Sequence, residues 1–265
     1  MIRSLCARTS SLATTLVASG LLTAAVLSTA GCGDTITFAG ESRKQGLALY
    51  KEGNYADAAG SFRNATKQDP RDYRSYYGLG TCYDAMGRYQ EAIGAYRSAL
   101  DTMNVTLEGK NDTAFRRRVI DALAIAVSKS SDRQRQIDNI VAAGRGKESP
   151  EQFVLLGKIY RYSNDPDGAI EAYNRAALLD PKDFAVAKEY GLYLVDIRQT
   201  ERAETLLRRA YQMNPRDQEV LEGLRRIGVV PGPSLNREDE LAQPALPKGP
   251  LPAGPGNTPT VAPRD

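Results

Sequence analysis

The chain contains no histidine and no tryptophan among its 265 residues, and only three cysteines. The missing histidine removes the commonest general base, the usual partner of a nucleophilic Ser or Cys, and the commonest metal ligand. The sequence also contains no Gly-rich phosphate-binding loop. These absences argue against an enzyme, so we expect no catalytic residues, no metal site and no cofactor.

Charges of the two signs almost cancel. Residues 1–31 hold two arginines and no acidic residue, so 33 basic and 32 acidic side chains remain in the rest of the chain. Such a balance does not favour nucleic acid as a partner. Among the cysteines, Cys82 lies in an apolar helical segment, and we expect it to be a small buried hydrophobe rather than a reactive thiol.

A sparse pattern that recurs four times is the main positive signal. Within each of two pairs of repeats, a glycine, an alanine, a large residue and a second alanine recur at an offset of 34 residues. The glycines are Gly46, Gly80, Gly157 and Gly191, and the large residues are Phe62, Tyr96, Tyr173 and Leu207. This period predicts stacked helical hairpins, each too small to bury its apolar face alone. Glycine in mid-helix costs about 1 kcal/mol against alanine, so we expect these glycines at close helix crossings.

Helix start and stop signals follow the same period. Three of the four repeats close on Asp or Asn, then Pro, a basic residue and Asp, at residues 69–72, 180–183 and 214–217. The proline stops one helix and the aspartate two residues later can cap the next. Asp165 and Pro166 likewise suit an N-cap and the first residue of a helix.

Residues 76–104 resemble a tetratricopeptide repeat. The matching residues are Tyr76, Leu79, Gly80 and Tyr83 in the first helix, Gly87 and Tyr89 at the turn, and Ala92, Tyr96 and Ala99 in the second helix. The outer repeats depart from the family pattern, with Gln45 where Leu is usual and Leu194 where Tyr is usual. The resemblance covers roughly residues 39–228. It implies an all-α fold, a right-handed superhelical solenoid of helical hairpins, four recognisable and one divergent, with a C-terminal capping helix.

The predicted array divides into repeats at about 39–72, 73–106, 107–149, 150–183 and 184–217, followed by a cap helix at 217–227. The unit at 107–149 is divergent, with an apolar helical stripe in residues 112–129 and a shorter one from Ile137 to Val141. Arg225 occupies the small-residue place of the last helix, which predicts a polar-faced lid.

The N-terminal segment predicts export. Arg3 and Arg8 precede an apolar, small-residue run with no acidic residue before Asp34, so we expect residues 1–31 to be a signal peptide. Ala30-Gly31-Cys32 resembles the lipobox of bacterial lipoproteins, which implies lipidation at Cys32 and, by similarity to known sorting signals, an outer-membrane anchor facing the periplasm. Cleavage after Ala30, giving a soluble periplasmic protein, and an uncleaved membrane anchor are the alternatives.

The regions that flank the array are predicted to be simple. Residues 32–38 should form a short linker. Residues 229–265 hold nine of the fourteen prolines and few large apolar side chains, so they cannot bury enough surface to offset the cost of ordering. We expect a Pro-rich disordered tail, either a spacer or a ligand for an aromatic-lined groove.

In tetratricopeptide proteins, fixed positions of the first helices line a concave groove that binds peptides. By resemblance these positions are Arg43, Tyr50, Lys51, Arg74, Tyr77, Thr81, Asp84, Lys158, Arg161, Tyr162, Lys188 and Asp196. Basic and aromatic side chains dominate, which implies an extended or acidic peptide as the ligand. Leu47, Thr81 and Leu192 stand where the family's chaperone-tail clamp uses Asn, which argues against that clamp. The alternative is that these are ordinary solvated surface residues.

Together, these observations predict a non-catalytic protein–protein interaction adaptor or scaffold of the bacterial cell envelope. Its partners would be envelope proteins, and a lipid anchor would hold it on a membrane; nucleic acid and small-molecule substrates are not expected. Two narrower alternatives remain open. One is an assembly factor for a pilus or an outer-membrane secretion pore, because the chain loosely resembles tight-adherence pilus lipoproteins. The other is an accessory subunit of an envelope or wall-remodelling enzyme.

Overall fold

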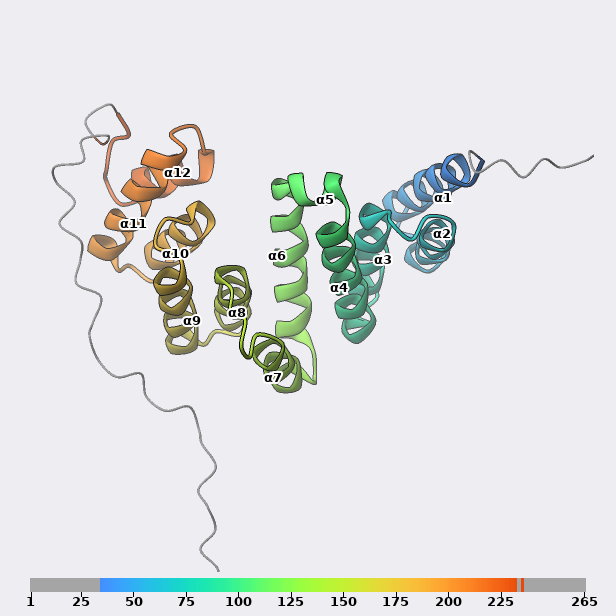
Figure 1. The fold of residues 1–265 in the computed structure, drawn as a ribbon, viewed down its shortest axis with the longest axis horizontal. Coiled ribbons are helices and arrows are strands. Elements are labelled where there is room, and N and C mark those ends of the chain that lie inside the picture. The colour runs from blue at the N-terminus through green and yellow to red at the C-terminus, as the bar shows by residue number, and fades with distance from the viewer. Residues whose placement is uncertain (1–33, 233–234, 236–265) are drawn as a thin grey trace, which may run out of the picture.

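The computed structural model describes residues 34–232 and 235, and these residues form twelve α-helices and no strand (Figure 1). The helices are α1 (Asp34–Lys51), α2 (Tyr55–Gln68), α3 (Tyr73–Ala85), α4 (Tyr89–Val105), α5 (Leu107–Asn111), α6 (Thr113–Lys129), α7 (Arg133–Ala143), α8 (Pro150–Tyr162), α9 (Pro166–Leu179), α10 (Phe184–Asp196), α11 (Thr200–Met213) and α12 (Gln218–Arg226).

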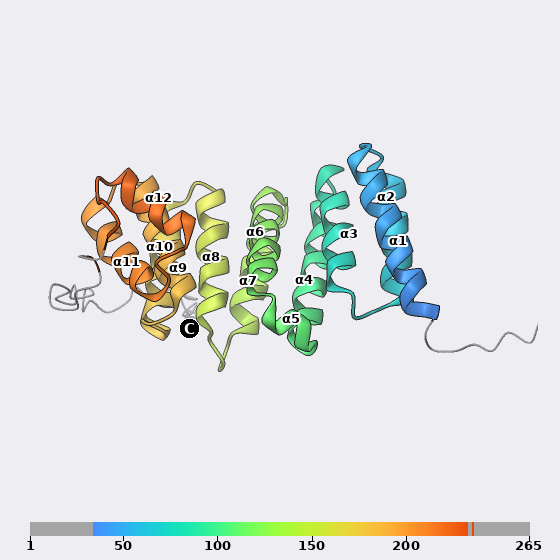
Figure 2. The same ribbon diagram turned by 90° about the horizontal axis from the view of Figure 1, so that it is seen from above.

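Four regular hairpins account for most of the array: α1 with α2, α3 with α4, α8 with α9, and α10 with α11. They stand side by side in a single row from α1 to α12, with the divergent unit in the middle (Figure 2). The prediction of an all-helical solenoid of stacked hairpins is therefore confirmed.

In each regular hairpin, one glycine of the first helix lies at the contact with the second helix. A Cβ atom added to Gly80 would lie 2.5 Å from the ring of Tyr96, and one added to Gly157 would lie 2.8 Å from Tyr173. The corresponding glycines of the outer hairpins, Gly46 and Gly191, meet Phe62 at 3.1 Å and Leu207 at 2.9 Å. The recurring glycines thus allow a large side chain of the second helix to lie against the backbone of the first, as expected from their period.

The predicted caps are also confirmed. The side chain of Asp72 accepts hydrogen bonds from two backbone N–H groups at the start of α3, and Asp183 and Asp217 do the same for α10 and α12. Asp165 caps α9, whose first residue is Pro166. Each of these caps satisfies backbone N–H groups that have no partner within the first turn of the helix, and so fixes the residue at which that helix begins.

The divergent unit departs from this plan. Its helices α6 and α7 fall close to the two predicted stripes, but the short helix α5 was not predicted. Apart from its hairpin partner α4, α3 packs chiefly against α2, the second helix of the preceding hairpin. Apart from its hairpin partner α9, α8 packs chiefly against α6, the helix before α7, rather than against α7 itself. Helix α7 lies near one end of α6 (Figure 1). Buried side chains form two apolar clusters that both include residues of α8, so this helix joins the two halves of the array.

The two ends of the array differ from the predicted boundaries. Helix α1 begins at Asp34, inside the segment assigned to a linker. At the other end, Val229 and Leu235 pack against the second apolar cluster, and the Gln212 side chain donates a hydrogen bond to the Leu235 carbonyl at 3.3 Å. The packed array therefore extends past residue 229, the start of the predicted tail, because Val229 and Leu235 bury apolar surface against the second cluster.

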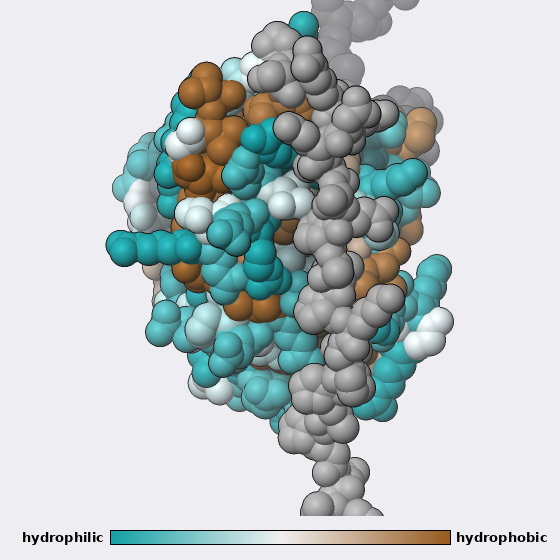
Figure 3. All heavy atoms as spheres, turned by 90° about the vertical axis from the view of Figure 1, so that its left-hand side faces the viewer, coloured by the Kyte–Doolittle hydropathy of each residue, from teal (hydrophilic) through white to brown (hydrophobic). Residues whose placement is uncertain are grey.

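Beyond α11, the lid helix α12 behaves as expected, with Arg225 exposed. Where this end is not overlain by residues drawn in grey, its surface is largely hydrophilic, with smaller apolar patches (Figure 3). Within the residues that the structure describes, no helix is long and apolar enough to cross a membrane. The predicted signal peptide, Cys32 and most of the Pro-rich tail lie outside the described residues.

Candidate interaction groove

Two hollows lie along the first helices of the repeats and share one residue, Asp121. The N-terminal hollow has a volume of about 340 Å³ and is formed chiefly by α1, α3 and α6. The C-terminal hollow has a volume of about 430 Å³ and is formed by α6, α8, α10 and α12. We call the two together the first-helix groove.

Eight of the twelve predicted groove residues line these hollows. Tyr50, Tyr77, Thr81 and Asp84 line the N-terminal hollow, and Lys158, Arg161, Tyr162 and Asp196 line the C-terminal hollow. The other four, Arg43, Lys51, Arg74 and Lys188, line neither. The family positions therefore identify much of the groove but not its full extent.

Five of the six basic side chains among the twelve predicted residues, all but Lys51, are paired with carboxylates. Arg43 lies 2.8 Å from Asp72, and Arg161 lies 2.6 Å from Asp196. Arg74 reaches both Glu108 and Asp112, at 2.5 and 3.1 Å, and its guanidinium also lies over the Tyr73 ring. Each pair links a first helix to a residue further along the array, so these cations stabilise contacts between repeats.

The two lysines are buried rather than exposed. Lys158 is 4% exposed and Lys188 is 2% exposed. The Lys158 ammonium lies 2.7 Å from Asp121 on α6 and 2.5 Å from Glu189 on α10. Burial alone would lower the pKa of Lys158, but the charges of Glu189 and Asp121 outweigh it and raise the pKa. The lysine therefore stays charged and joins three successive first helices.

Lys188 has a similar arrangement one repeat later. Its ammonium contacts Glu219 and lies 3.3 Å from Asp217, the N-cap of α12. The expectation that Lys158 and Lys188 project into the groove as available positive charges is thus wrong, because each is enclosed by carboxylates of neighbouring helices. A general preference for acidic peptides does not follow from these residues.

Tyrosine side chains line both hollows of the groove. Tyr50 is 36% exposed and Tyr162 is 42% exposed, so both rings are accessible to a partner. Tyr77 is partly buried and packs at 5.7 Å from Tyr96 and at 5.0 Å from Phe115, centroid to centroid. Burial raises the pKa of both Tyr77 and Tyr162, so their hydroxyls remain neutral hydrogen-bonding groups.

The divergent helix α6 supplies groove residues that the sequence reasoning missed. Arg118 and Ile125 line the N-terminal hollow, and Asp121 lines both hollows. The family positions could not be transferred here because this unit has no glycine and alanine landmarks to set the alignment. One signal in the sequence could have identified Asp121. The apolar residues of an amphipathic helix face the core, so a polar residue between them in the sequence faces outward, where a groove can form.

No group of His, Cys, Asp and Glu side chains within the described residues is arranged to hold a metal ion. The buried thiol of Cys82 has its pKa raised by burial to about 11, which matches the expectation of an unreactive core residue.

Comparison with known proteins gives one family. A model of the tetratricopeptide repeat matches residues 43–102 and 154–224. The unmatched interval contains α5, α6 and α7, the helices that depart from the regular plan. No curated protein matches the chain.

Several solved structures are similar in part. A thermophilic tetratricopeptide repeat protein of Thermus thermophilus is 17% identical with a TM-score of 0.43, over 72% of this chain and 100% of that one. PilF of Pseudomonas aeruginosa is 17% identical with a TM-score of 0.31, and the match covers 74% of this chain and 85% of PilF. MamA of Desulfovibrio magneticus is 17% identical with a TM-score of 0.34, over 71% and 99%.

Proposed function

The chain belongs to the tetratricopeptide repeat family, and from that premise we propose that it is a non-catalytic adaptor that binds an extended segment of a partner protein in the first-helix groove. The observation that carries the proposal is the groove itself, two hollows that meet at Asp121 and together reach from α1 to α12. An extended peptide rises about 3.3 Å per residue, so a short segment is enough to contact several first helices at once.

The chemistry of the groove suits this role. Exposed Tyr50 and Tyr162 offer large rigid surfaces with a polar tip, the residue type that is enriched in protein interfaces. Ion pairs in the C-terminal hollow hold α6, α8 and α10 in fixed positions, so that part of the surface is organised before a partner arrives. Binding to such a surface costs less ordering than binding to a flexible one.

An adaptor role agrees with what the composition lacks. The absence of histidine leaves the groove without the residue most often used for proton transfer near neutral pH. Its carboxylates are engaged in ion pairs that join helices, as with Asp121 and Glu189 on Lys158. The groove therefore offers contacts for recognition and no evident constellation for chemistry.

Site-specific photocrosslinking in the native cells tests the proposal. A photoreactive phenylalanine analogue placed at Tyr50 or Tyr162 should form covalent adducts with a partner, which mass spectrometry would identify. The same analogue at Lys67 on α2 or at Arg145 in the α7–α8 loop serves as the control, because both residues are exposed and neither lines the groove. Equal yields of the same adduct from all four positions would contradict a groove site.

The adduct would also separate the narrower candidates. A pilus or pore subunit as partner would favour the assembly-factor role, and a wall-remodelling enzyme would favour the accessory-subunit role. Both would use the same groove.

We further propose that the protein acts in the bacterial cell envelope, anchored by a lipid at Cys32. The support is the sequence of residues 1–32, with two arginines, an apolar run and the Ala-Gly-Cys junction. A single acyl chain binds membranes weakly, and stable anchoring takes more than one chain, as in a bacterial lipoprotein.

Replacement of Cys32 tests the anchor. Cys32→Ser should abolish incorporation of radiolabelled fatty acid and release the protein from the membrane fraction into the soluble periplasm. The unmodified protein provides the reference in both measurements. Absence of label in the unmodified protein would instead favour cleavage after Ala30.

A further inference from the structure

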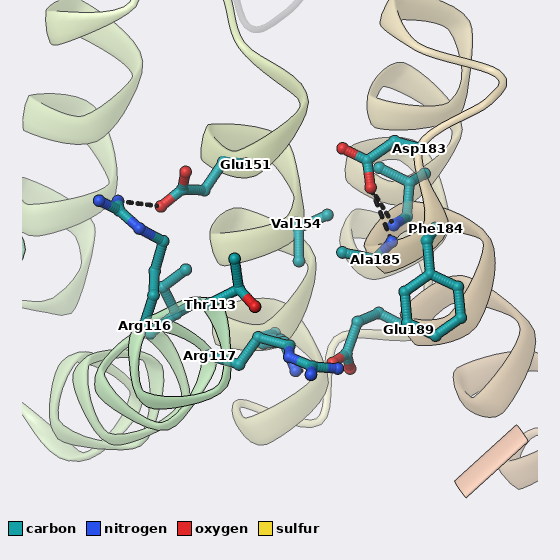
Figure 4. A pocket seen from close by; sticks show the side chains of 12 residues that line it. Thr113, Arg116, Arg117, Glu151, Val154, Asp183, Phe184, Ala185 and Glu189 are labelled. Carbon is teal, nitrogen blue, oxygen red and sulfur yellow. Dashed lines mark hydrogen bonds and ion pairs between the residues drawn. The ribbon is translucent and has the colours of Figure 1, made fainter. Parts of the chain in front are cut away.

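A third hollow lies beside the groove, between the N-terminal halves of α6, α8 and α10 (Figure 4). It has a volume of about 350 Å³ and shares Lys158 and Glu189 with the C-terminal hollow. We call it the three-helix pocket. The family positions used to predict the groove include only Lys158 of its lining, so neither the sequence nor the family resemblance assigns it a role.

Helix caps set the geometry of this pocket. Asp112, Ser149 and Asp183 cap α6, α8 and α10, so the first turns of three successive first helices lie around one space. Its apolar lining consists of Ile120, Val154, Phe184, Ala185 and Val186. A volume near the lower end of the range for ligand sites suits one large side chain rather than a whole ligand.

The carboxylates around the pocket are all engaged. Glu151 accepts a hydrogen bond from Arg116 at 3.1 Å, and Glu189 accepts one from Lys158 at 2.5 Å. Asp183 accepts hydrogen bonds from the backbone N–H groups of Ala185 and Val186 (Figure 4). None of these groups is left to bind a cation from a partner.

Arg117 is the exception among the charged residues of the pocket. Its nearest carboxylate oxygen, on Asp217, lies 3.9 Å away, beyond hydrogen-bond distance. That carboxylate is already used, because it caps α12 and accepts a hydrogen bond from Lys188. With the residues that the structure describes, Arg117 forms no hydrogen bond. In Figure 4 its side chain extends from α6 toward the α10 side of the pocket, whereas Arg116 points to Glu151.

We propose that the three-helix pocket receives a large apolar side chain of the partner segment, and that Arg117 binds the side-chain carboxylate of an Asp or Glu next to it. This rests on the proposed groove function and names the class of segment: an apolar residue of the size of Leu or Phe adjacent to an acidic one. A guanidinium and a carboxylate form paired, charge-assisted hydrogen bonds that fix direction as well as position. The apolar lining of the pocket would bury the large side chain of the partner, and Arg117 would provide a positive charge for the acidic residue.

The neighbouring Arg118 does not share this role. It lines the N-terminal hollow, where its guanidinium carbon lies 5.4 Å from the centre of the Phe115 ring. Two carboxylates, Asp84 and Asp121, line the same hollow and would repel an acidic residue. Arg118 therefore belongs to the groove and not to the three-helix pocket. The matched control of the same charge is the exposed Arg145 in the α7–α8 loop, which lines neither the groove nor the pocket.

Selection from a random peptide library displayed on phage, with the full chain immobilised, tests the proposal. Selected peptides should be enriched in a large apolar residue adjacent to Asp or Glu. Arg117→Glu should weaken their binding by at least about tenfold, because a charge-assisted contact is replaced by repulsion. Ala185→Phe should weaken binding by filling the pocket without a change in charge. Substitution of the acidic residue of the peptide by Gln should reduce the effect of Arg117→Glu.

Controls distinguish the possible failures. Arg145→Glu and Lys67→Glu should bind the selected peptides as the unmodified protein does, and circular dichroism should show unchanged helicity in every variant. Arg117→Gln removes the charge without repelling Asp217, so it covers the case in which Arg117→Glu folds poorly. Groove-binding peptides that lack the apolar–acidic pair, or that respond equally to Arg117→Glu and Arg145→Glu, would overturn this inference and leave the groove function standing. A selection that yields no peptide at all would overturn both.

Discussion

The contact between Gly157 and Tyr173 shows how single residues hold the array together. An added Cβ at Gly157 would lie 2.8 Å from the Tyr173 ring, closer than side chains normally approach. Tyr173 is fully buried and stacks at 5.5 Å on Tyr190, so it has little room to move aside. The glycine therefore sets how closely α8 and α9 can cross.

Replacement of Gly157 by Leu should overpack this crossing. We expect the free energy of unfolding to fall by about 1–3 kcal/mol, because a well-packed core does not accept extra volume without strain. Gly94 is the matched control, since it lies in α4 with open space around it. Gly94→Leu should leave stability unchanged or raise it slightly through better helix propensity. Thermal melts of the three proteins check both expectations, and an equal midpoint for Gly157→Leu and the unmodified protein would show that the crossing tolerates a side chain.

At this scale, sequence reasoning succeeded where the signal was a contact within one repeat. The pairing of Gly157 with Tyr173 recurs at a fixed spacing, so the period revealed it. The environment of Lys158 could not be found in the same way. Lysine is usually exposed, and its two carboxylate partners come from other repeats at spacings that differ, 37 residues back to Asp121 and 31 residues on to Glu189. Only the superhelical geometry brings these three side chains together.

Among the elements, helices with capping signals were predicted well. The Asp-Pro-x-Asp sequence that ends at Asp183 stops α9 and caps α10, and both ends follow from local chemistry. The turns between paired helices show a second local rule. Gly53 and Gly87 adopt positive φ angles of 80° and 73°, and Asn164 and Arg198 take the same conformation at 57° and 62°. The turn geometry is therefore kept even where glycine is absent.

The divergent hairpin shows where local signals stop. Its apolar stripes located α6 and α7, but nothing in them indicated that, outside its own hairpin, α8 would pack against α6 rather than against α7. That arrangement depends on how much apolar surface the short helix α7 can offer, with only Ile137 and Ile140 among its buried apolar residues. The same helix α6 places Arg117 beside the three-helix pocket and Arg118 in the groove, so the most informative part of the site lay in the least predictable element.

For the whole molecule, the absence of histidine shapes the dependence of stability on pH. With no histidine, no side chain has an ordinary pKa between those of the carboxylates and that of cysteine. Tyrosine is abundant, with 14 residues, and many lie between helices. Burial is the first cause of the raised pKa of Tyr73, Tyr96 and Tyr173, and Tyr73 reaches about 12.

We therefore expect the free energy of unfolding to be nearly constant from about pH 6 to pH 8 and to fall above about pH 10. Stability falls at high pH because the two states bind protons differently. Tyrosines of the unfolded chain lose their protons near pH 10, whereas the buried tyrosines of the folded protein retain them, so alkali favours the unfolded state. For Tyr73 the contribution is complete below about pH 10 and is lost as the pH rises toward about 12. Cys82, with a pKa of about 11, acts in the same direction from slightly lower pH. Urea unfolding at a series of pH values measures the profile.

Tyr173→Phe isolates one part of this effect. The Tyr173 hydroxyl is buried and has no hydrogen-bond partner among the described residues. Its removal should therefore raise the free energy of unfolding at neutral pH by about 1 kcal/mol, since burial of an unpaired hydroxyl costs about 1–3 kcal/mol. The same change should make the alkaline loss smaller, because one tyrosine with a raised pKa no longer ionises on unfolding. A variant that is less stable at neutral pH would contradict the expectation and show that the hydroxyl is hydrogen-bonded in solution; an unchanged alkaline profile would show that Tyr173 ionises equally in both states.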